Sequence, residues 1–392
     1  MKNGRFGGKI AVNYEEILAK AKKKLDRRME FLDPSSPEHE NCVTVDGRYT
    51  NSFINMYEMD GSPWTRSFLT GALAYLYYHF KEDKYLDYLE KSYPRYEEYA
   101  YKYKKSICHD AGFLFSLYAV ALYKVSGDEK AYNLALKAAD EMIKRFRFKA
   151  GVIHGFGPAC GARAETIIDD MMNTAIIMWA FQETGNQFYQ DVFRSHIKVT
   201  LRDMMRDDYT FRHAAQWDAN SGEYLNELNF CGYSCGSVWA RGQGWALYGL
   251  VNVLAVTGDR DYIPTINGVV NRIISFLPAD RVPLWDMNCV GSTTTNIDTS
   301  AALIIANAFM KLAEIMDVSE LQGEAKNCSR YADEILDSII QNYLAPDESE
   351  HLVEKAQCGS MQAGAVWGDY FFVEALMRKL HGRECPDFWS NI

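Results

Sequence analysis

The feature that most constrains the fold is a repeated alternation between two kinds of helical segment. Apolar residues recur at helical spacing throughout the chain, and segments that are apolar on all sides alternate with segments that carry one polar face. The apolar segments are expected at 65–80, 110–125, 168–183, 238–256, 299–316 and 368–380. The amphipathic segments are expected at 14–30, 83–104, 128–145, 187–204, 261–276 and 320–343. Since we find no convincing alternating strand, the pattern predicts an all-α protein.

Short turns of similar chemistry join the members of these pairs. Three of them contain Gly followed by Asp or Asn, at Gly127-Asp128, Gly185-Asn186 and Gly258-Asp259. Gly can end one helix in the left-handed conformation, and Asp or Asn can cap the next. The result is a degenerate repeat of helical hairpins at roughly 45 to 75 residues. Inner apolar helices ringed by outer amphipathic ones predict an (α/α)6 barrel, a toroid of six hairpins, rather than an α-solenoid with more regular repeats.

Length and composition favour one large domain. The chain has 392 residues, of which 48% are hydrophobic, and it contains no low-complexity stretch or obvious linker. We therefore expect a single α/α toroid domain over residues 1–392. Residues 1–13 are expected to form an irregular N-terminal segment, and residues 31–63, which are rich in Pro, Ser, Asn and Gly, a second irregular stretch.

Charge and cysteine usage exclude several classes of function. The net charge is −10 and no Lys/Arg cluster stands out, so we expect no nucleic-acid partner. No run approaches about eighteen apolar residues, which predicts no membrane span. The N-terminus lacks the apolar core of a secretory signal, and nine widely spread cysteines fit reduced thiols in a cytoplasmic protein. The spacing of the Cys and His residues fits no metal site, and no phosphate-binding loop is present, so we expect neither a metal nor a cofactor. We expect the protein to be a monomer or a homodimer.

The candidate site follows from the geometry of such a ring. All inner helices of a closed ring run the same way, so their N-termini gather at one end, each with partial positive charge. The residues of unusual chemistry fall at these helix starts. They are Trp64; His109 and Asp110; Asp169 and Asp170; Trp239, Arg241, Gln243 and Trp245; Asp298; and Trp367, Gly368 and Asp369. Carboxylates, Trp, Arg and Gln at one end of successive inner helices predict the lining of a binding site.

Each candidate has a functional and a structural interpretation. Asp169 and Asp170 fit either a helix N-cap or a catalytic acid at the mouth of a pocket, and their spacing leaves both open. Two Asp residues on different helices can divide roles, with one held neutral to donate a proton. Arg241 can hold a carboxylate in a fork, or it can neutralise an internal one. Likewise Trp64 can stack on a sugar ring or lie in the core, and His213 can be a satisfied loop histidine.

Several short motifs appear in order along nearly the whole chain. They are Trp64-Thr65, His109-Asp110-Ala111-Gly112-Phe113, Ile167-Ile168-Asp169, Gly232-Tyr233-Ser234, Trp239-Ala240-Arg241-Gly242-Gln243-Gly244-Trp245, Asp298-Thr299-Ser300-Ala301 and Trp367-Gly368-Asp369-Tyr370. The set resembles the unsaturated glucuronyl hydrolases of glycoside hydrolase family 88. This resemblance implies an α6/α6 barrel and a hydrolase that removes a 4,5-unsaturated glucuronic (uronic) acid from the non-reducing end of lyase-generated oligosaccharides. In such enzymes an Asp protonates the vinyl ether at C4, water adds at C5, and the hemiketal opens.

Carried over position by position, the resemblance makes Asp169 the general acid and base and Asp110 the second essential Asp. The positions expected to contact substrate are Trp64, His109, His213, Trp239, Arg241, Gln243, Trp245 and Trp367. Asp169 rather than Asp170 is the match because it follows the paired Ile residues, so Asp170 is expected to be an outward-facing helix cap. Protonation of carbon requires a strong acid in place, so we expect burial or Asp110 to raise the pKa of Asp169.

Some positions depart from the family pattern. Cys231 stands where relatives place a pocket Gln, and residues 64–69 lack the usual Trp-Thr-x-Gly-Phe-Trp. The loop 357–362 does not clearly reproduce the Ser/Lys loop of relatives that prefer sulfated glycosaminoglycan fragments, which favours unsulfated substrates. Two alternatives stay open: an unsaturated rhamnogalacturonyl hydrolase that acts on pectin fragments, and a non-catalytic oligosaccharide-binding toroid.

Overall fold

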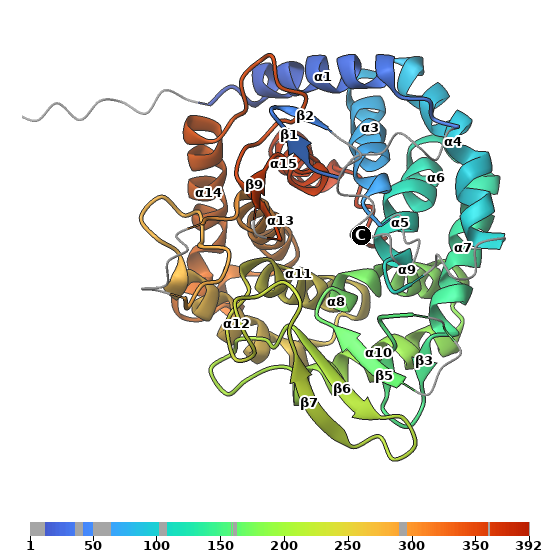
Figure 1. Ribbon diagram of the computed structural model, residues 1–392, viewed down its shortest axis with the longest axis vertical. Helices are drawn as coiled ribbons and strands as arrows, with labels where there is room; N and C mark the ends of the chain where they lie inside the picture. Colours follow the sequence, from blue (N-terminus) through green and yellow to red (C-terminus); the bar gives the residue numbers. More distant parts are fainter. Residues whose placement is uncertain are drawn as a thin grey trace, which may run out of the picture.

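A ring of helical hairpins forms the body of the molecule (Figure 1). The computed structural model describes residues 12–35, 42–49, 64–101, 108–157, 159, 163–289, 296–359 and 361–391. The inner helices are α3 (Arg66–Phe80), α5 (Ala111–Phe115) continued through a π-helical turn at Ser116–Val120 into α6 (Ala121–Ser126), α9 (Ala175–Thr184), α11 (Ala240–Thr257), α13 (Thr299–Ile315) and α15 (Val366–His381). The outer helices are α1 (Tyr14–Phe31), α4 (Asp83–Tyr101), α7 (Glu129–Ile143), α10 (Gln187–Asp203), α12 (Ile263–Phe276) and α14 (Cys328–Asn342). The predicted (α/α)6 barrel is confirmed.

Some predictions fall on residues outside the described part. The irregular segment expected at 1–13 lies there except for Val12 and Asn13, which precede α1. The same holds for residues 36–41 and 50–63 of the second irregular stretch, and for Ser360 in the 357–362 loop. None of the helices in the described ranges has the length and apolar character needed to cross a membrane.

Burial separates the two rings of helices as their sequences predict. Every residue of α11 from Ala240 to Leu254 is buried, whereas α1 buries only five of its eighteen residues. A helix that is apolar on all sides must be enclosed, and a helix with one apolar face covers the ring from outside. The inner helices therefore supply the core and also the residues that converge at its two ends.

The predicted turns between helices are also confirmed. Gly127, Gly185 and Gly258 have φ angles of 75°, 67° and 63°, the left-handed conformation in which glycine ends a helix without strain. Asp128 then accepts hydrogen bonds from the N–H groups of Lys130 (2.7 Å) and Ala131 (3.0 Å), as an N-cap should. These turns reverse the chain between an inner helix and the next outer one.

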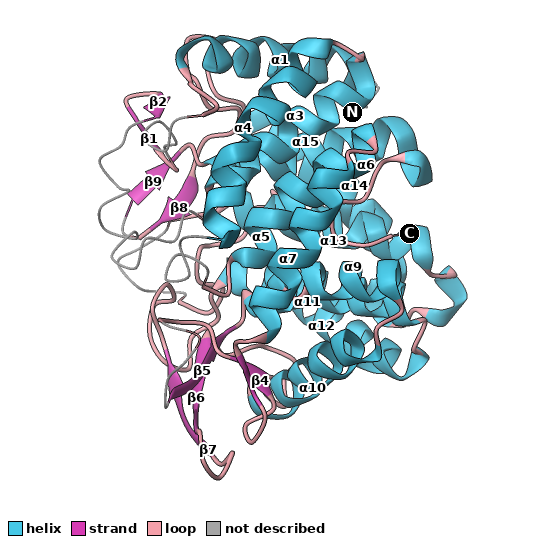
Figure 2. Cartoon of the chain, turned by 90° about the vertical axis from the view of Figure 1, so that its right-hand side faces the viewer, coloured by secondary structure: helices cyan, strands magenta, loops and turns pink. Residues whose placement is uncertain are grey.

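The chain is mostly helical as predicted, but it also contains short strands that the sequence pattern did not indicate. Strands β5 (Arg163–Ile167), β6 (Ala214–Asp218) and β7 (Tyr224–Leu228) form an antiparallel sheet in that order. Two-residue and three-residue strands form the ribbons β1–β2 (Thr44–Val45, Arg48–Tyr49), β3–β4 (Phe146–Arg147, Val152–Ile153) and β8–β9 (Ala356–Cys358, Met361–Ala363). Figure 2 shows the strands gathered beside one end of the helical ring. They are too short and too rich in Ala, Gln, Asn and Glu to show alternation.

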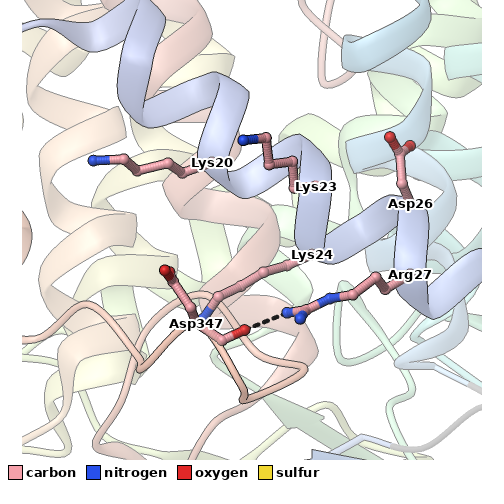
Figure 3. Close-up of a pocket in the computed structure, with 6 residues that line it drawn as sticks. All are labelled: Lys20, Lys23, Lys24, Asp26, Arg27 and Asp347. Atoms are coloured by element: carbon pink, nitrogen blue, oxygen red, sulfur yellow. Dashed lines mark hydrogen bonds between the residues drawn. The ribbon is translucent and has the colours of Figure 1, made fainter.

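A hollow of about 470 Å³ beside α1 is lined mainly by basic side chains (Figure 3). Two of these cations, Lys24 and Arg27, anchor the chain. The Lys24 ammonium donates to the carbonyl oxygens of Ala345 (2.9 Å), Pro346 (2.6 Å) and His351 (3.0 Å), and Arg27 donates to the carbonyl of Asp347. These bonds fasten the segment that follows α14 to α1, so we assign these cations to the fold.

Candidate active site

The three-stranded sheet brings Asp169 close to His213. Ile167 at the end of β5 pairs with Ala214 at the start of β6, and the Ile168 N–H donates to the His213 carbonyl at 2.9 Å. Asp169 follows at the N-cap position of α8 (Asp170–Asn173), but its side chain makes no capping bond. One of its carboxylate oxygens, Oδ2, is buried with no hydrogen-bond partner in the described ranges. A buried polar atom without a partner is a place where a ligand can bind.

The prediction that Asp170 is an outward-facing cap is wrong. Asp170 is fully buried, its Oδ2 accepts a hydrogen bond from the Thr166 hydroxyl, and its Oδ1 has no partner among the described residues. The reason is that α8 is a single turn that starts where β5 ends, so the side chain points back towards the strand. Burial raises the pKa of Asp170 to about 6, against the opposing effect of His109.

Asn173 fixes the two helix starts that carry Asp110 and Asp169. Its Oδ1 accepts from the Phe113 N–H at 2.7 Å, and its Nδ2 donates to Asp110 Oδ1 (3.4 Å) and to the Asp169 carbonyl (3.2 Å). A Cβ on Gly112 would lie 2.1 Å from the Asn173 carbonyl oxygen, so glycine is needed for this approach. Sequence reasoning missed Asn173, whose one signal was its position four residues after Asp169.

His109 is held between two acceptors and carries a positive charge. Its Nδ1 lies 2.6 Å from the Gly155 carbonyl oxygen, and its Nε2 lies 3.3 Å from Asp110 Oδ1. Because both ring nitrogens face acceptors, both carry protons. Burial alone would lower the pKa of His109, but Asp110 and then Asp170 hold it well above its ordinary value. His109 therefore forms an ion pair with Asp110 rather than acting as a neutral base.

Asp169 is a carboxyl group that binds its proton unusually tightly. Burial, the largest cause, raises its pKa to about 7; His109 and Arg241 oppose the shift, while Asp110 and Asp170 add to it. This raised pKa agrees with the expectation for a group that must donate a proton. The arrangement thus gives two neighbouring carboxyl groups different surroundings: Asp169 has a raised pKa, and Asp110 is paired with His109.

Arg241 lies between two tryptophan rings. Its guanidinium carbon is 4.8 Å from the centroid of Trp239 and 5.3 Å from that of Trp367. Its Nη1 donates to Asp298 Oδ2 and to the Gln357 carbonyl, both at 2.8 Å. Its Nε and Nη2 make no hydrogen bond within the described ranges, so one side of the guanidinium fork is available for a ligand carboxylate. Asp298 also caps α13: one of its carboxylate oxygens accepts hydrogen bonds from N–H groups at the start of this helix, and the other accepts from Arg241.

The predicted tryptophans differ in exposure. Trp64 is partly exposed and stacks on buried Trp367, with centroids 5.4 Å apart and planes inclined by 25°. Trp245 is fully buried between Phe113 (5.0 Å) and Phe371 (5.5 Å). Trp64 is therefore placed to meet a ligand, whereas Trp245 packs in the core beneath Arg241.

The side chain of Gln243 makes its hydrogen bonds to the protein backbone. Its Oε1 accepts from the Phe211 N–H (2.8 Å), and its Nε2 donates to the carbonyls of Phe211 (3.2 Å) and Trp239 (3.3 Å). These bonds fix the segment before β6, which carries His213. Gln243 thus contributes to the site indirectly, by holding the segment that carries His213.

His213 is not a fully satisfied loop histidine. Its Nδ1 lies 3.1 Å from the backbone nitrogens of Phe230 and Cys231 and from Asn229 Oδ1, but its Nε2 is buried without a partner in the described ranges. Burial lowers the pKa of His213 to about 4, so the ring is neutral at pH 7. It also packs on Trp239, with ring centroids 4.5 Å apart. Burial raises the pKa of the Cys231 thiol to about 12, although Arg241 opposes the shift.

One group of residues has the donor atoms of a metal site. Cys108, His109 and Asp110 place three candidate ligand atoms within 4.8 Å of one another, and no other such group occurs in the described ranges. However, the Cys108 thiol donates to Asp110 Oδ2 at 3.2 Å, and both nitrogens of His109 carry protons. Since a metal ligand must be a deprotonated ring nitrogen, these atoms fit an ion pair better than a metal.

The fold and this site define a glycoside hydrolase with an α/α toroid. Residues 41–279 match the family model Glycosyl Hydrolase Family 88. The chain is 30% identical, over 83% of its length and 84% of the relative's, to an unsaturated chondroitin disaccharide hydrolase of Streptococcus pneumoniae. It is 28% identical, over 82% and 88% of the two lengths, to an unsaturated glucuronyl hydrolase of Bacillus sp. strain GL1.

Solved structures agree with this comparison. The crystal structure of an unsaturated glucuronyl hydrolase from Bacillus sp. GL1 superimposes with a TM-score of 0.87 at 25% identity, covering 96% of this chain and 99% of that one. The structure of an unsaturated glucuronyl hydrolase from Streptococcus agalactiae gives 0.86 at 26% identity, covering 95% and 93%. The chain belongs to glycoside hydrolase family 88.

Proposed function

We propose that the protein removes a 4,5-unsaturated uronic acid from the non-reducing end of oligosaccharides that polysaccharide lyases release. The observation that carries this proposal is the pair of adjoining carboxyl groups, of which Asp169 has a pKa raised to about 7 and Asp110 is paired with His109. The named relatives, which are unsaturated glucuronyl or chondroitin disaccharide hydrolases, support it.

The reaction starts with a proton on Asp169. Neutral Asp169 donates this proton to C4 of the vinyl ether, and the positive charge that develops at C5 attracts a water molecule. The Asp169 carboxylate then takes a proton from the water as it adds to C5, which restores the acid. The hemiketal so formed opens and releases the remaining sugar. Because no attack at the anomeric carbon occurs, the carboxylate spacing that separates retaining from inverting glycosidases does not apply.

The other residues bind the unsaturated sugar in this proposal. The free Nε and Nη2 groups of Arg241 hold its carboxylate, and Trp64 stacks on its ring. Asp110, oriented by its contact with His109, accepts hydrogen bonds from the hydroxyl groups of the sugar. The unpartnered Nε2 of His213 supplies one more polar contact beside Asp169.

The rest of the substrate is expected to be unsulfated. Sulfate recognition requires cations, and the sequence contains no Lys or Arg between Ala356 and Ala363, the β8–β9 turn near Arg241. The eight cysteines in the described ranges are free thiols, which supports the expected cytoplasmic location.

A panel of lyase products tests the proposal. The enzyme is mixed with unsaturated disaccharides from chondroitin, hyaluronan, heparin, gellan, xanthan and pectin lyases, and absorbance of the conjugated C4=C5 bond is followed. We expect loss of absorbance with hexosamine- or glucose-linked uronates. Exclusive activity on rhamnose-linked products would establish the rhamnogalacturonyl alternative instead. Binding without any absorbance loss would show a non-catalytic toroid.

A further inference from the structure

A second buried carboxylate lies behind the catalytic pair and takes no part in the proposed reaction. Asp170 is fully buried, and its bond to the Thr166 hydroxyl leaves Oδ1 without a partner among the described residues. A buried carboxylate is costly unless a counter-charge is near. A cation near Asp170 would offset this cost, and two cations, His109 and Arg145, are close.

The two cations converge on one backbone carbonyl. His109 Nδ1 lies 2.6 Å from the Gly155 oxygen, and Arg145 Nη2 donates to the same oxygen at 3.3 Å. Arg145 is buried as well and also donates to the carbonyls of His154 and Gly157, both at 2.7 Å. Two buried positive charges at one acceptor repel each other, so the arrangement needs negative charge beside it.

Asp170 supplies that charge from the side opposite to Asp110. The point that a Cβ would occupy on Gly155 lies 3.6 Å from Asp170 Oδ2 and 3.6 Å from His109 Nδ1. Asp110 lies at the other ring nitrogen, 3.3 Å from Nε2. Asp170 is thus near the Nδ1 side of the imidazolium and Asp110 is at the Nε2 side; Cys108, His154, Asp169 and Arg145 are the other titratable or charged groups around the ring.

We propose that Asp170 is a positioning residue of the catalytic pair: its buried carboxylate keeps His109 doubly protonated, and His109 in turn pairs with Asp110 and fixes it beside Asp169. This rests on the proposed roles of Asp110 and Asp169. The direction of the His109 pKa shift, to which Asp170 contributes, agrees with it. The charges of His109 and Arg145 balance those of Asp110 and Asp170, so that the remaining carboxyl group, Asp169, can keep its proton.

An NMR titration of the histidine rings tests the proposal without substrate, so its result stands whether or not the proposed reaction is found. Protein labelled with 15N in histidine is titrated from pH 5 to 9, and the His109 signal is assigned by its loss in His109→Gln. We expect the wild-type ring to stay protonated through pH 8. In Asp170→Asn the same ring should lose its proton at least one pH unit lower.

Activity supplies a second readout that a merely structural role would not move. Supporting groups of this kind contribute about 10- to 100-fold. We expect the ratio of wild-type to Asp170→Asn kcat to grow at least tenfold between pH 6 and pH 8, because His109 discharges in the variant over that range. Loss of native packing alone would lower kcat by the same factor at each pH.

Two variants serve as controls. Thr166→Ser keeps the hydroxyl that donates to Asp170 and so keeps the charge of that carboxylate, and the His109 titration should be unchanged. Asp87→Asn removes an exposed carboxylate on α4 and should change neither readout. A wild-type His109 that titrates near pH 6.5 would overturn the proposal even if Asp170→Asn failed to fold. A protonated His109 and a constant kcat ratio in Asp170→Asn would also overturn it.

Discussion

The two ends of the barrel both bury charged side chains, but they satisfy them differently. At the end where the inner helices finish, buried Lys311 contacts Asp387 and donates to Asn252 Oδ1 (2.6 Å) and Ser390 Oγ (2.9 Å). Arg378 pairs there with Glu374 at 3.2 Å. At the end where they begin, Asp169 Oδ2, Asp170 Oδ1 and His213 Nε2 are buried without partners in the described ranges. Paired charges hold the ring together, whereas buried polar atoms without a partner are places where a ligand can bind.

The pKa shifts separate the two ends in the same way. Burial would raise the pKa of Asp387, but Lys311 and Arg378 hold it well below its usual range. At the opposite end burial prevails over His109 and raises the pKa of Asp169 to about 7. The C-terminal residues strengthen the first end, since Trp389 is fully buried and stacks on Phe371 with planes inclined by 9°. The buried carboxylate at the first end is thus held ionised, whereas the one at the second end has the raised pKa that the proposed proton transfer requires.

The largest expected effect is at the far end, where buried charges are paired. Lys311→Met leaves Asp387 buried beside Arg378 but without its closest partner, and breaking a buried pair of this kind costs about 3–5 kcal/mol in the free energy of unfolding. Urea unfolding followed by tryptophan fluorescence measures the loss. Lys20→Met, which removes an exposed partner of Glu16, should leave the curve unchanged. Unaltered stability in Lys311→Met would show that this buried pair does not stabilise the fold. A fall in kcat of the folded variant would show that this end also affects catalysis. Either result would contradict the proposed difference between the two ends.

The next effect concerns Arg241 at the catalytic end. Arg241→Lys keeps a positive charge for Asp298 but loses the Nε–Nη2 fork, so we expect KM to rise about 10- to 100-fold, the value of a charged hydrogen bond. Steady-state absorbance kinetics measure it. Arg272→Lys, which alters a partly exposed pair with Asp208, is the matched control. An unchanged KM would mean that Arg241 does no more than neutralise Asp298.

The pH dependence of activity gives a smaller, graded effect. Asp169 must carry a proton to act as an acid, and its pKa is raised to about 7. Activity is therefore retained below that pH and lost above it, and kcat/KM should fall about tenfold for each pH unit beyond it. Initial rates from pH 5 to 9 test this, with circular dichroism to confirm that the protein stays folded. A profile that is flat to pH 9 would be incompatible with Asp169 as the acid.

The smallest effect is a gain in stability when the acid is removed. Between its ordinary value of 3.8 and about 7, Asp169 binds its proton more tightly in the folded state, so the folded state loses stability as pH rises through this window. Asp169→Asn avoids this loss and should raise the unfolding midpoint by about 2–5 °C at pH 8, and by nothing near pH 3.5. Differential scanning calorimetry measures both. A lower midpoint at pH 8 would show that the ionised carboxylate stabilises the fold.

The ring could be predicted from the sequence because it leaves local signals, whereas the choice of Asp169 as the acid rests on a short motif and stays a prediction. The unequal hydrophobicity of paired helices gives the toroid, and the Ile167-Ile168-Asp169 motif selects one of two adjacent carboxylates. The direction of Asp170 could not be predicted, because it depends on β5 leading directly into α8, and β5 shows no alternation. The role of Asn173 could not be predicted from the sequence either, because one of its hydrogen-bond partners, Asp110, is 63 residues away in the chain.

The most direct test of the central claim compares wild type with Asp169→Asn on one unsaturated disaccharide at pH 6. The two proteins should show the same circular dichroism spectrum. The wild type should consume the conjugated double bond, whereas the variant should do so about 10³-fold more slowly or not at all, because the proton donor to C4 is missing. Turnover at an undiminished rate in Asp169→Asn would contradict the account and move the catalytic acid to another residue.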